Sequence, residues 1–201
     1  MSLDFEHLWK LVSKQYHRPE YSIHGPAHWR RVERNGLLLA TQTGADISVV
    51  RLFALFHDSR RENDGDDRGH GARGAAYAAS LRGEAYELSE DRFKLLRFAC
   101  VWHTDGNRDD DPTIGTCWDA DRLDLGRVGV IPDPEFMSTD FGREIAAFGS
   151  IQPFLQRARA THERTDISER PIGVTHPARG ASRGRDWPRG RCRGRSRRAR
   201  W

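Results

Sequence analysis

A histidine and an aspartate stand together at the end of an apolar segment. His57 and Asp58 directly follow "LFALF" (52–56) and precede "SRR" (59–61). Imidazole nitrogen and carboxylate oxygen together suit a divalent transition metal. Adjacent residues of a helix diverge by about 100°, so a shared ion must lie between them, beside the end of the helix. The alternative is a helix C-terminus where His57 meets the dipole, but an acid is unfavourable there and Asp58 stays unexplained.

Other histidines lie at the boundaries or on the apolar faces of expected helices: His24, His28, His70 and His103. His24 and His28 have the i, i+4 spacing of the HExxH zinc motif. Gly25 replaces its glutamate, however, and Pro26 places the helix start after His24. We therefore predict His28 as a ligand inside the helix and His24 outside it, in an outer or substrate-side position. Any one of these histidines, taken alone, is more often a hydrogen-bonded core residue.

Three aspartates follow one another closely in "CWDADRLDLG" (117–126). On a helix, Asp119 and Asp121 point about 200° apart, so only one of them can enter a given site. Asp121 and Asp124 can share a face, which keeps Asp124 as a competitor. The alternative is a solvated acidic turn paired with Arg122.

The segments that must position these residues have the sequence pattern of helices. Apolar residues recur at helical spacing, and no segment shows a strong alternating strand pattern. We expect helices over 3–16, 26–43, 45–58, 70–83, 88–103, 116–129 and 138–164. Asp46 or Ser48 and Ser89 are candidate N-caps, and Pro153 should kink or split the last helix. The Ala-rich segment 70–83 could pack closely against a neighbour. The chain is therefore predicted to be all-α.

Composition restricts the class of protein further. With 201 residues and 37% hydrophobic residues, the chain suits one domain, or one domain with an appendage. No apolar stretch approaches the length of a membrane span, and the N-terminus lacks a signal-peptide pattern. Three cysteines in no paired spacing suit a reducing compartment. We expect a cytoplasmic protein with no membrane partner.

The C-terminal segment differs chemically from the rest. Residues 179–201 hold ten arginines and one aspartate, a net charge of +9, whereas the remainder holds 23 basic and 28 acidic residues, a net charge of −5. We divide the chain into a helical metal-binding domain, 1–167, and a basic low-complexity tail, 168–201, expected to be disordered. Such a tail could bind nucleic acid through phosphates. Its Arg, Gly, Pro, Ala and Trp are equally typical of a shifted reading frame in GC-rich DNA.

The order of the candidate residues resembles the H…HD…D signature of the HD superfamily. His28, His57-Asp58 and Asp121 stand in its ligand positions. The flanks "HWRRVERNGLLLA", "LFALFHDSRR", "HGARGAAYA" and "DADRLD" are similar to the family's motifs, and the likeness covers about residues 20–130. It implies a compact helical bundle that binds one or two divalent metals.

The resemblance also implies ligand roles. The first metal would be held by His28, His57, Asp58 and Asp121. His70 and His103 match positions that add a second metal in binuclear branches, with Asp58 bridging. Many relatives have Gly-Lys shortly after the HD pair, whereas this chain has Arg60-Arg61. Arg61 takes the place of the lysine, so a phosphate contact with a forked donor geometry is kept.

We therefore predict a metal-dependent phosphohydrolase that attacks a small, nucleotide-like phosphate ester with metal-activated water. Asp58, Arg61 and His24 are the candidate catalytic residues, with His24 as proton donor to the leaving group. Arg60 and Arg73 are further phosphate contacts or solvated surface residues. Mn, Fe, Co, Ni, Zn and Mg all suit a His/Asp site. Two alternatives remain: an HD-type di-iron oxygenase, which uses the same four histidines and two aspartates, and a non-catalytic nucleic-acid-binding protein acting through the tail.

Overall fold

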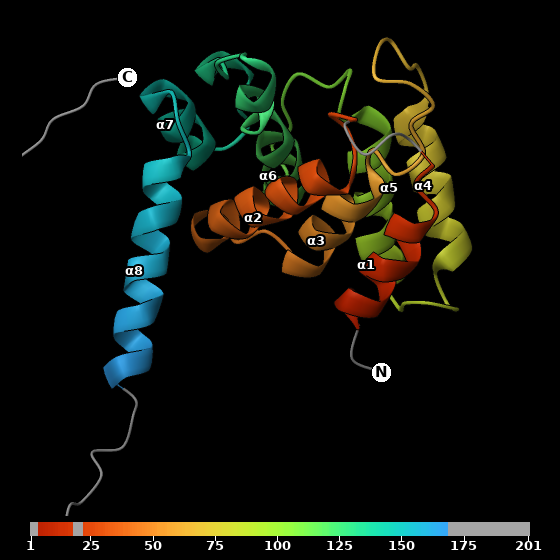
Figure 1. Ribbon diagram of the computed structural model, residues 1–201, viewed down its shortest axis with the longest axis horizontal. Coiled ribbons are helices and arrows are strands. Elements are labelled where there is room, and N and C mark those ends of the chain that lie inside the picture. The colour runs from red at the N-terminus through yellow and green to blue at the C-terminus, as the bar shows by residue number, and fades with distance from the viewer. Residues whose placement is uncertain (1–3, 18–21, 169–201) are drawn as a thin grey trace, which may run out of the picture.

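The chain folds as a bundle of helices (Figure 1). The computed structural model describes residues 4–17 and 22–168, with only the helical backbone described for 161–168. The described residues form no β-strand. The α-helices are α1 (Phe5–Lys14), α2 (Pro26–Thr43), α3 (Ile47–Phe56), α4 (His70–Leu81), α5 (Glu90–Trp102), α6 (Pro112–Arg122), α7 (Asp140–Phe148) and α8 (Gln152–Ser168). Two short 3₁₀ helices, η1 (Leu125–Val128) and η2 (Pro134–Phe136), connect α6 to α7.

Most helix boundaries follow from the capping residues that the sequence offers. Pro26 occupies the first turn of α2, and Gly44 ends it in the left-handed region at φ 70°. The carboxylate of Asp46 accepts hydrogen bonds from the first backbone amides of α3. Pro153 does split the C-terminal region, because it lies in the first turn of α8. Ser89 takes the N-cap position of α5 but makes no capping hydrogen bond with its side chain.

Helix α3 lies at the centre of the bundle and is contacted by α1, α2, α4, α5 and α6. Its near-continuous apolar sequence requires this position, because apolar side chains on all sides of a helix must be covered. The buried members are Val49, Val50, Leu52, Phe53, Ala54, Leu55 and Phe56. The chain then leaves α3 at His57 and Asp58, which are themselves 0% and 2% exposed. Two polar residues are thus delivered into the core.

Two glycines allow α4 to lie close to its neighbours. A Cβ on Gly71 would lie 2.1 Å from the carbonyl oxygen of Cys100 in α5. A Cβ on Gly74 would lie 2.2 Å from the carbonyl oxygen of Phe56 at the end of α3. Because His70 begins α4, this close packing sets how near the His70 side chain comes to the residues that follow α3 and α5. The expected close contact of the Ala-rich helix is confirmed.

Helices α7 and α8 lie on the side of the bundle opposite α4 and α5 in Figure 1. Ile145 of α7 and Leu155 of α8 are buried. The predicted disorder of the basic tail concerns residues 168–201, which fall outside the described residues except for Ser168. Among the described helices, none combines the length and apolar composition that crossing a bilayer requires.

Candidate metal centre

Four donor atoms from three parts of the chain converge at the end of α3. The Nε2 atom of His28 lies 3.2 Å from Nε2 of His57, 3.1 Å from Oδ1 of Asp121 and 3.6 Å from Oδ2 of Asp58. The Nε2 atom of His57 lies 3.6 Å from the same oxygen of Asp58 and 3.8 Å from Oδ1 of Asp121. Helix α2 supplies His28, the turn after α3 supplies His57 and Asp58, and α6 supplies Asp121.

The hydrogen bonds of these two imidazoles leave both Nε2 atoms as acceptors. Nδ1 of His28 lies 2.7 Å from the carboxylate of Asp124, and Nδ1 of His57 lies 3.1 Å from the carbonyl oxygens of Phe53 and Ala54. Carbonyls and carboxylates only accept, so each Nδ1 carries the hydrogen. Two lone pairs and the carboxylate of Asp121 then face one point, an arrangement that could hold a cation there.

The spacing of the donors fits such a cation. Nitrogen and oxygen ligands lie about 2.0–2.2 Å from a transition metal, which places neighbouring ligands about 3.0–3.5 Å apart at octahedral or tetrahedral angles. The distances from the Nε2 atoms of His28 and His57 to each other and to the two carboxylates run from 3.1 to 3.8 Å, within this range or slightly above it. The donor set therefore fits a divalent metal in both chemistry and size.

A second set of donors lies on the other side of Asp58. Nε2 of His70 and Nε2 of His103 are 2.9 Å apart, and they lie 3.2 Å and 3.7 Å from Oδ1 of Asp58. Nδ1 of His70 donates to the carbonyl of Asp67, and Nδ1 of His103 donates to the carbonyl of Cys100. Again two imidazole lone pairs and a carboxylate oxygen face one point.

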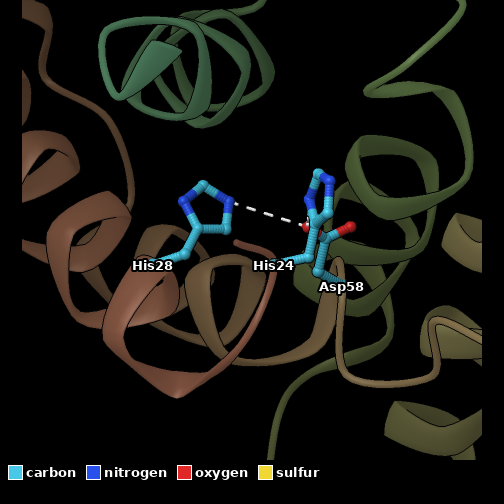
Figure 2. Close-up of side chains that lie close together, drawn as sticks. All are labelled: His24, His28 and Asp58. Atoms are coloured by element: carbon cyan, nitrogen blue, oxygen red, sulfur yellow. Dashed lines mark hydrogen bonds and ion pairs between the residues drawn. The ribbon is translucent and has the colours of Figure 1, made fainter. Parts of the chain in front are cut away.

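Asp58 therefore joins the two sets, with one oxygen directed at each. His24 adds a third imidazole, because its Nδ1 lies 2.9 Å from Oδ2 of Asp58. Figure 2 shows His24 and His28 beside this carboxylate, with the ion pair from His28 to Asp58 drawn as a dashed line. As expected, His24 precedes α2 and His28 lies within it. Within the described residues, three groups could each hold a metal ion: His24, His28 and Asp58; His28, His57 and Asp121; and Asp58, His70 and His103.

Burial and neighbouring charge shift the pKa values in the centre. Burial lowers the pKa of His57 to about 4, against the attraction of the Asp58 and Asp121 carboxylates. Burial also disfavours charge on His28, but its contacts with Asp121 and Asp124 prevail and raise its pKa. The pKa of Asp58 lies well below its usual value because His57 and the bonds from His103 and His24 outweigh burial.

In the second histidine pair, too, the pKa of one imidazole is lowered and that of the other is raised. Burial and the charge of His103 lower the pKa of His70. Burial opposes charge on His103 as well, but the adjacent Asp58 carboxylate raises its pKa. In each pair one imidazole thus holds a proton more firmly and its neighbour less firmly.

The three aspartates of α6 and the following turn have different partners. Asp121 faces the donors, with 21% of its side chain exposed. Asp119 is buried elsewhere and accepts hydrogen bonds from the backbone amides of Ser138 and Thr139 at the start of α7. Asp124 contacts the Nδ1 atom of His28, whereas the other donors lie at Nε2, and this contact fixes the orientation of the ring. The i, i+3 spacing of Asp121 and Asp124 predicted that they could share a face and compete for the site, but not that each would take a different nitrogen of His28.

Of the candidate arginines, Arg61 reaches the donors. Its Nη1 lies 3.4 Å from Oδ1 of Asp58 and 3.2 Å from Nε2 of His70. Arg60 instead stacks over the ring of Tyr77 at 3.6 Å. Arg73 donates to Asp67 at 2.6 Å. Arg60 and Arg73 are thus engaged outside the donor cluster.

Comparison with protein-family models and with curated proteins finds no match. Among solved structures, the chain is similar to the crystal structure of a predicted HD superfamily hydrolase from an uncultured Thermotogales bacterium. The two share 22% sequence identity with a TM-score of 0.56, and the alignment covers 82% of this chain and 91% of that one. With its helical bundle and its cluster of His and Asp donors at the end of α3, the chain has the HD-domain fold.

Proposed function

We propose that this protein is a metal-dependent phosphohydrolase that cleaves a small, nucleotide-like phosphate ester. The observation that carries the proposal is the placement of Asp58 between two imidazole pairs, with one oxygen directed at each. We assign His28, His57, Asp58 and Asp121 to a first divalent ion, and Asp58, His70 and His103 to a second. When bound, such an ion lowers the pKa of a coordinated water towards about 7 and polarises a phosphoryl oxygen.

Residues of the chain supply orientation and charge around these donors. Asp124 holds the ring of His28 by its Nδ1 hydrogen, and the carbonyls of Phe53 and Ala54 hold that of His57. Arg61 is the proposed contact for non-bridging phosphate oxygens, because its guanidinium lies at the donors with its side chain 9% exposed. His24 lies at the edge of the cluster, 15% exposed, and is the proposed proton donor to the leaving group.

A cavity of about 590 Å³ gives access to the second donor set. Its lining includes Arg61, His70 and Thr104, and also Arg68 and Trp102. Thr104 Oγ1 lies 3.3 Å from Nε2 of both His70 and His103. A phosphate group entering here would meet Arg61 and His70 together, which supports a phosphate ester as the substrate.

The test measures metal content and hydrolysis on the same preparations. Purified full-length protein is stripped with a chelator and reloaded with Mn, Fe, Co, Ni, Zn or Mg. It is then assayed on nucleoside monophosphates and p-nitrophenyl phosphate. We expect phosphate release that depends on the added metal and is lost in His57→Ala and Asp58→Ala. A stable di-iron centre with dioxygen uptake and no phosphate release would replace this proposal with an oxygenase.

We assign the activity to residues 1–167. Protein shortened after residue 167 should fold and hydrolyse the same substrate as the full chain. A salt-dependent RNA mobility shift that disappears on shortening would show that the tail binds nucleic acid. Loss of hydrolysis on shortening, with the fold kept, would contradict the assignment.

A further inference from the structure

A second cavity, of about 420 Å³, lies between α2, η1 and the turn that joins α7 to α8. It adjoins the metal centre through Asp124, which lines the cavity and contacts His28. Its charged lining residues are Arg31, Arg34, Arg127 and Asp124. Three guanidinium groups thus face one carboxylate. That carboxylate is also the partner of His28 Nδ1, at 2.7 Å. The lining of this cavity carries an excess of positive charge.

Two of the arginines share Asp124, and the third has no carboxylate partner among the described residues. Nε of Arg31 lies 2.8 Å and 3.0 Å from the two oxygens of Asp124. Nη1 of Arg127 lies 3.7 Å from one of them. Arg34 donates only to the side-chain oxygen of Asn35, at 3.2 Å, and its buried Nε has no hydrogen-bond partner.

The environment of Arg34 is unfavourable for an uncompensated cation. Burial lowers the pKa of its guanidinium, the Asp124 carboxylate offsets this only in part, and the charges of Arg159 and Arg31 lower the pKa further. A buried donor without a partner costs about 1–3 kcal/mol, and more for a charged group. An anion in the cavity would offset the positive charge of the guanidinium. The N-terminal end of α8 also faces the cavity and favours negative charge through the helix dipole.

Most of the other side chains of the lining are apolar, with Ser150 and Gln152 as the polar exceptions. Leu123, Ile145 and Ile151 are buried in the wall. Val130 and Ile131 also line the cavity, and they are 48% and 75% exposed. A ligand with an apolar body would cover these two side chains, which inorganic phosphate alone would not.

We propose that this cavity binds a small organic anion, with a phosphate or phosphonate group at Arg34, Arg31 and Arg127 and an apolar body against Val130 and Ile131. The site is distinct from the metal centre, because Arg61 and the proposed metal ligands do not line it. The proposal does not depend on which metal, if any, the donors hold. The bound anion would contact Arg31, the residue that pairs with Asp124.

Phenylphosphonate is a suitable probe, because its carbon–phosphorus bond is not a phosphate ester and its ring supplies the apolar body. Calorimetric titration of the full chain should show a site that persists in Arg61→Gln. Arg34→Gln should weaken that site at least tenfold, as should Arg127→Gln if Arg34→Gln fails to fold. Arg97→Gln, which removes an exposed charge on α5, should change the affinity less than twofold.

The apolar part of the proposal is tested separately. Val130→Ser/Ile131→Ser should weaken phenylphosphonate binding several-fold and leave the binding of inorganic phosphate unchanged. Three results would overturn the proposal: no binding at millimolar concentration, equal losses in Arg34→Gln and Arg97→Gln, or a site lost in Arg61→Gln and kept in Arg34→Gln. The last result would assign all binding to the metal centre.

Discussion

The Nε2 atoms of His28 and His57 lie 3.2 Å apart, and the Nδ1 atom of each ring already donates to an acceptor. Two imidazoles in this relation repel each other unless a cation lies between them. His70 and His103 repeat the relation at 2.9 Å. Asp58 belongs to both groups, so a positive charge at either histidine pair interacts with the same carboxylate.

Removal of metal should therefore destabilise the folded protein. A ligand at a free concentration one hundred times its Kd stabilises the native state by ~2.7 kcal/mol. We expect the unfolding temperature to fall on dialysis against a chelator and to recover with added divalent metal, measured by scanning calorimetry. Magnesium is the least favoured of the candidate ions for a site rich in imidazole. An unfolding temperature indifferent to every ion, with no metal found by elemental analysis, would contradict the assignment.

The two donor sets should lose metal separately. His103→Ala removes a donor of the second set only, so the protein should retain one equivalent of metal where the parent binds two. Asp58→Asn should reduce binding at both positions, because one oxygen of this residue faces each set. Metal content by inductively coupled plasma mass spectrometry gives the stoichiometry. Equal content in His103→Ala and the parent protein would assign His103 to the core rather than to a metal.

Arg61 should affect both substrate and metal. Its guanidinium contacts Asp58 and His70, the donors that face the second position. Arg61→Gln should lower kcat/KM about 10²–10³-fold, as expected when a donor to developing charge is removed. The same substitution should tighten binding of the second ion, because a positive charge leaves its neighbourhood. Arg68→Gln is the matched control, since Arg68 lines the same cavity with its side chain 91% exposed. Weaker metal binding in Arg61→Gln would contradict this interpretation.

Close helix packing at α4 should prove sensitive to one added methyl group. A Cβ at Gly74 would lie 2.2 Å from the carbonyl oxygen of Phe56, so α4 must move away from α3. We expect Gly74→Ala to lower the free energy of unfolding by about 1–3 kcal/mol, as in overpacked cores. Urea titration measures this value. Gly126→Ala is the control, because a Cβ there meets no atom within 4 Å. Similar effects at both positions would show that the contact at Phe56 is not the cause.

Metal affinity should rise with pH. His28 and His103 have pKa values above 6.5, so at pH 6 a metal must displace protons from them. His57, with a pKa of about 4, has no proton to lose in this range. In the metal-free protein, the stability from the raised pKa values is present below pH 6.5 and is lost as pH rises. The gain in unfolding temperature on adding metal should therefore be larger at pH 8 than at pH 6. A constant gain would contradict the assignment of these histidines.

Most of the fold could be predicted because short-range sequence features, such as capping residues and apolar patterns, specify the same helices that the packed bundle contains. Pro26, Asp46 and Pro153 act within a few residues of their own position, and the structure uses each of them as expected. The near-continuous apolar pattern of α3 predicted its burial for the same reason. Ser89 is the exception, because its position at the N-cap does not by itself direct its hydroxyl group to a backbone amide.

The arrangement of the candidate site could be predicted only in part. Sequence order and resemblance singled out His28, His57-Asp58 and Asp121. That the two oxygens of Asp58 face different histidine pairs depends on where α4 and α5 lie, which no short-range pattern specifies. The role of Asp124 depends on a contact between residues 96 positions apart. The cavity of three arginines was missed for the same reason, because Arg31 and Arg127 are brought together only by the packed bundle.

The distribution of the donors along the chain has a consequence for folding. Each of the consecutive helices α2 to α6 contributes a donor within it or directly after it, and α7 and α8 contribute none of the six proposed ligands. Ions bound at these donors would close several long loops at once, as a set of disulfide bonds does, and would reduce the conformational entropy of the unfolded chain. The metal would then act as a reversible cross-link of the central bundle, and the C-terminal helices could open without releasing it.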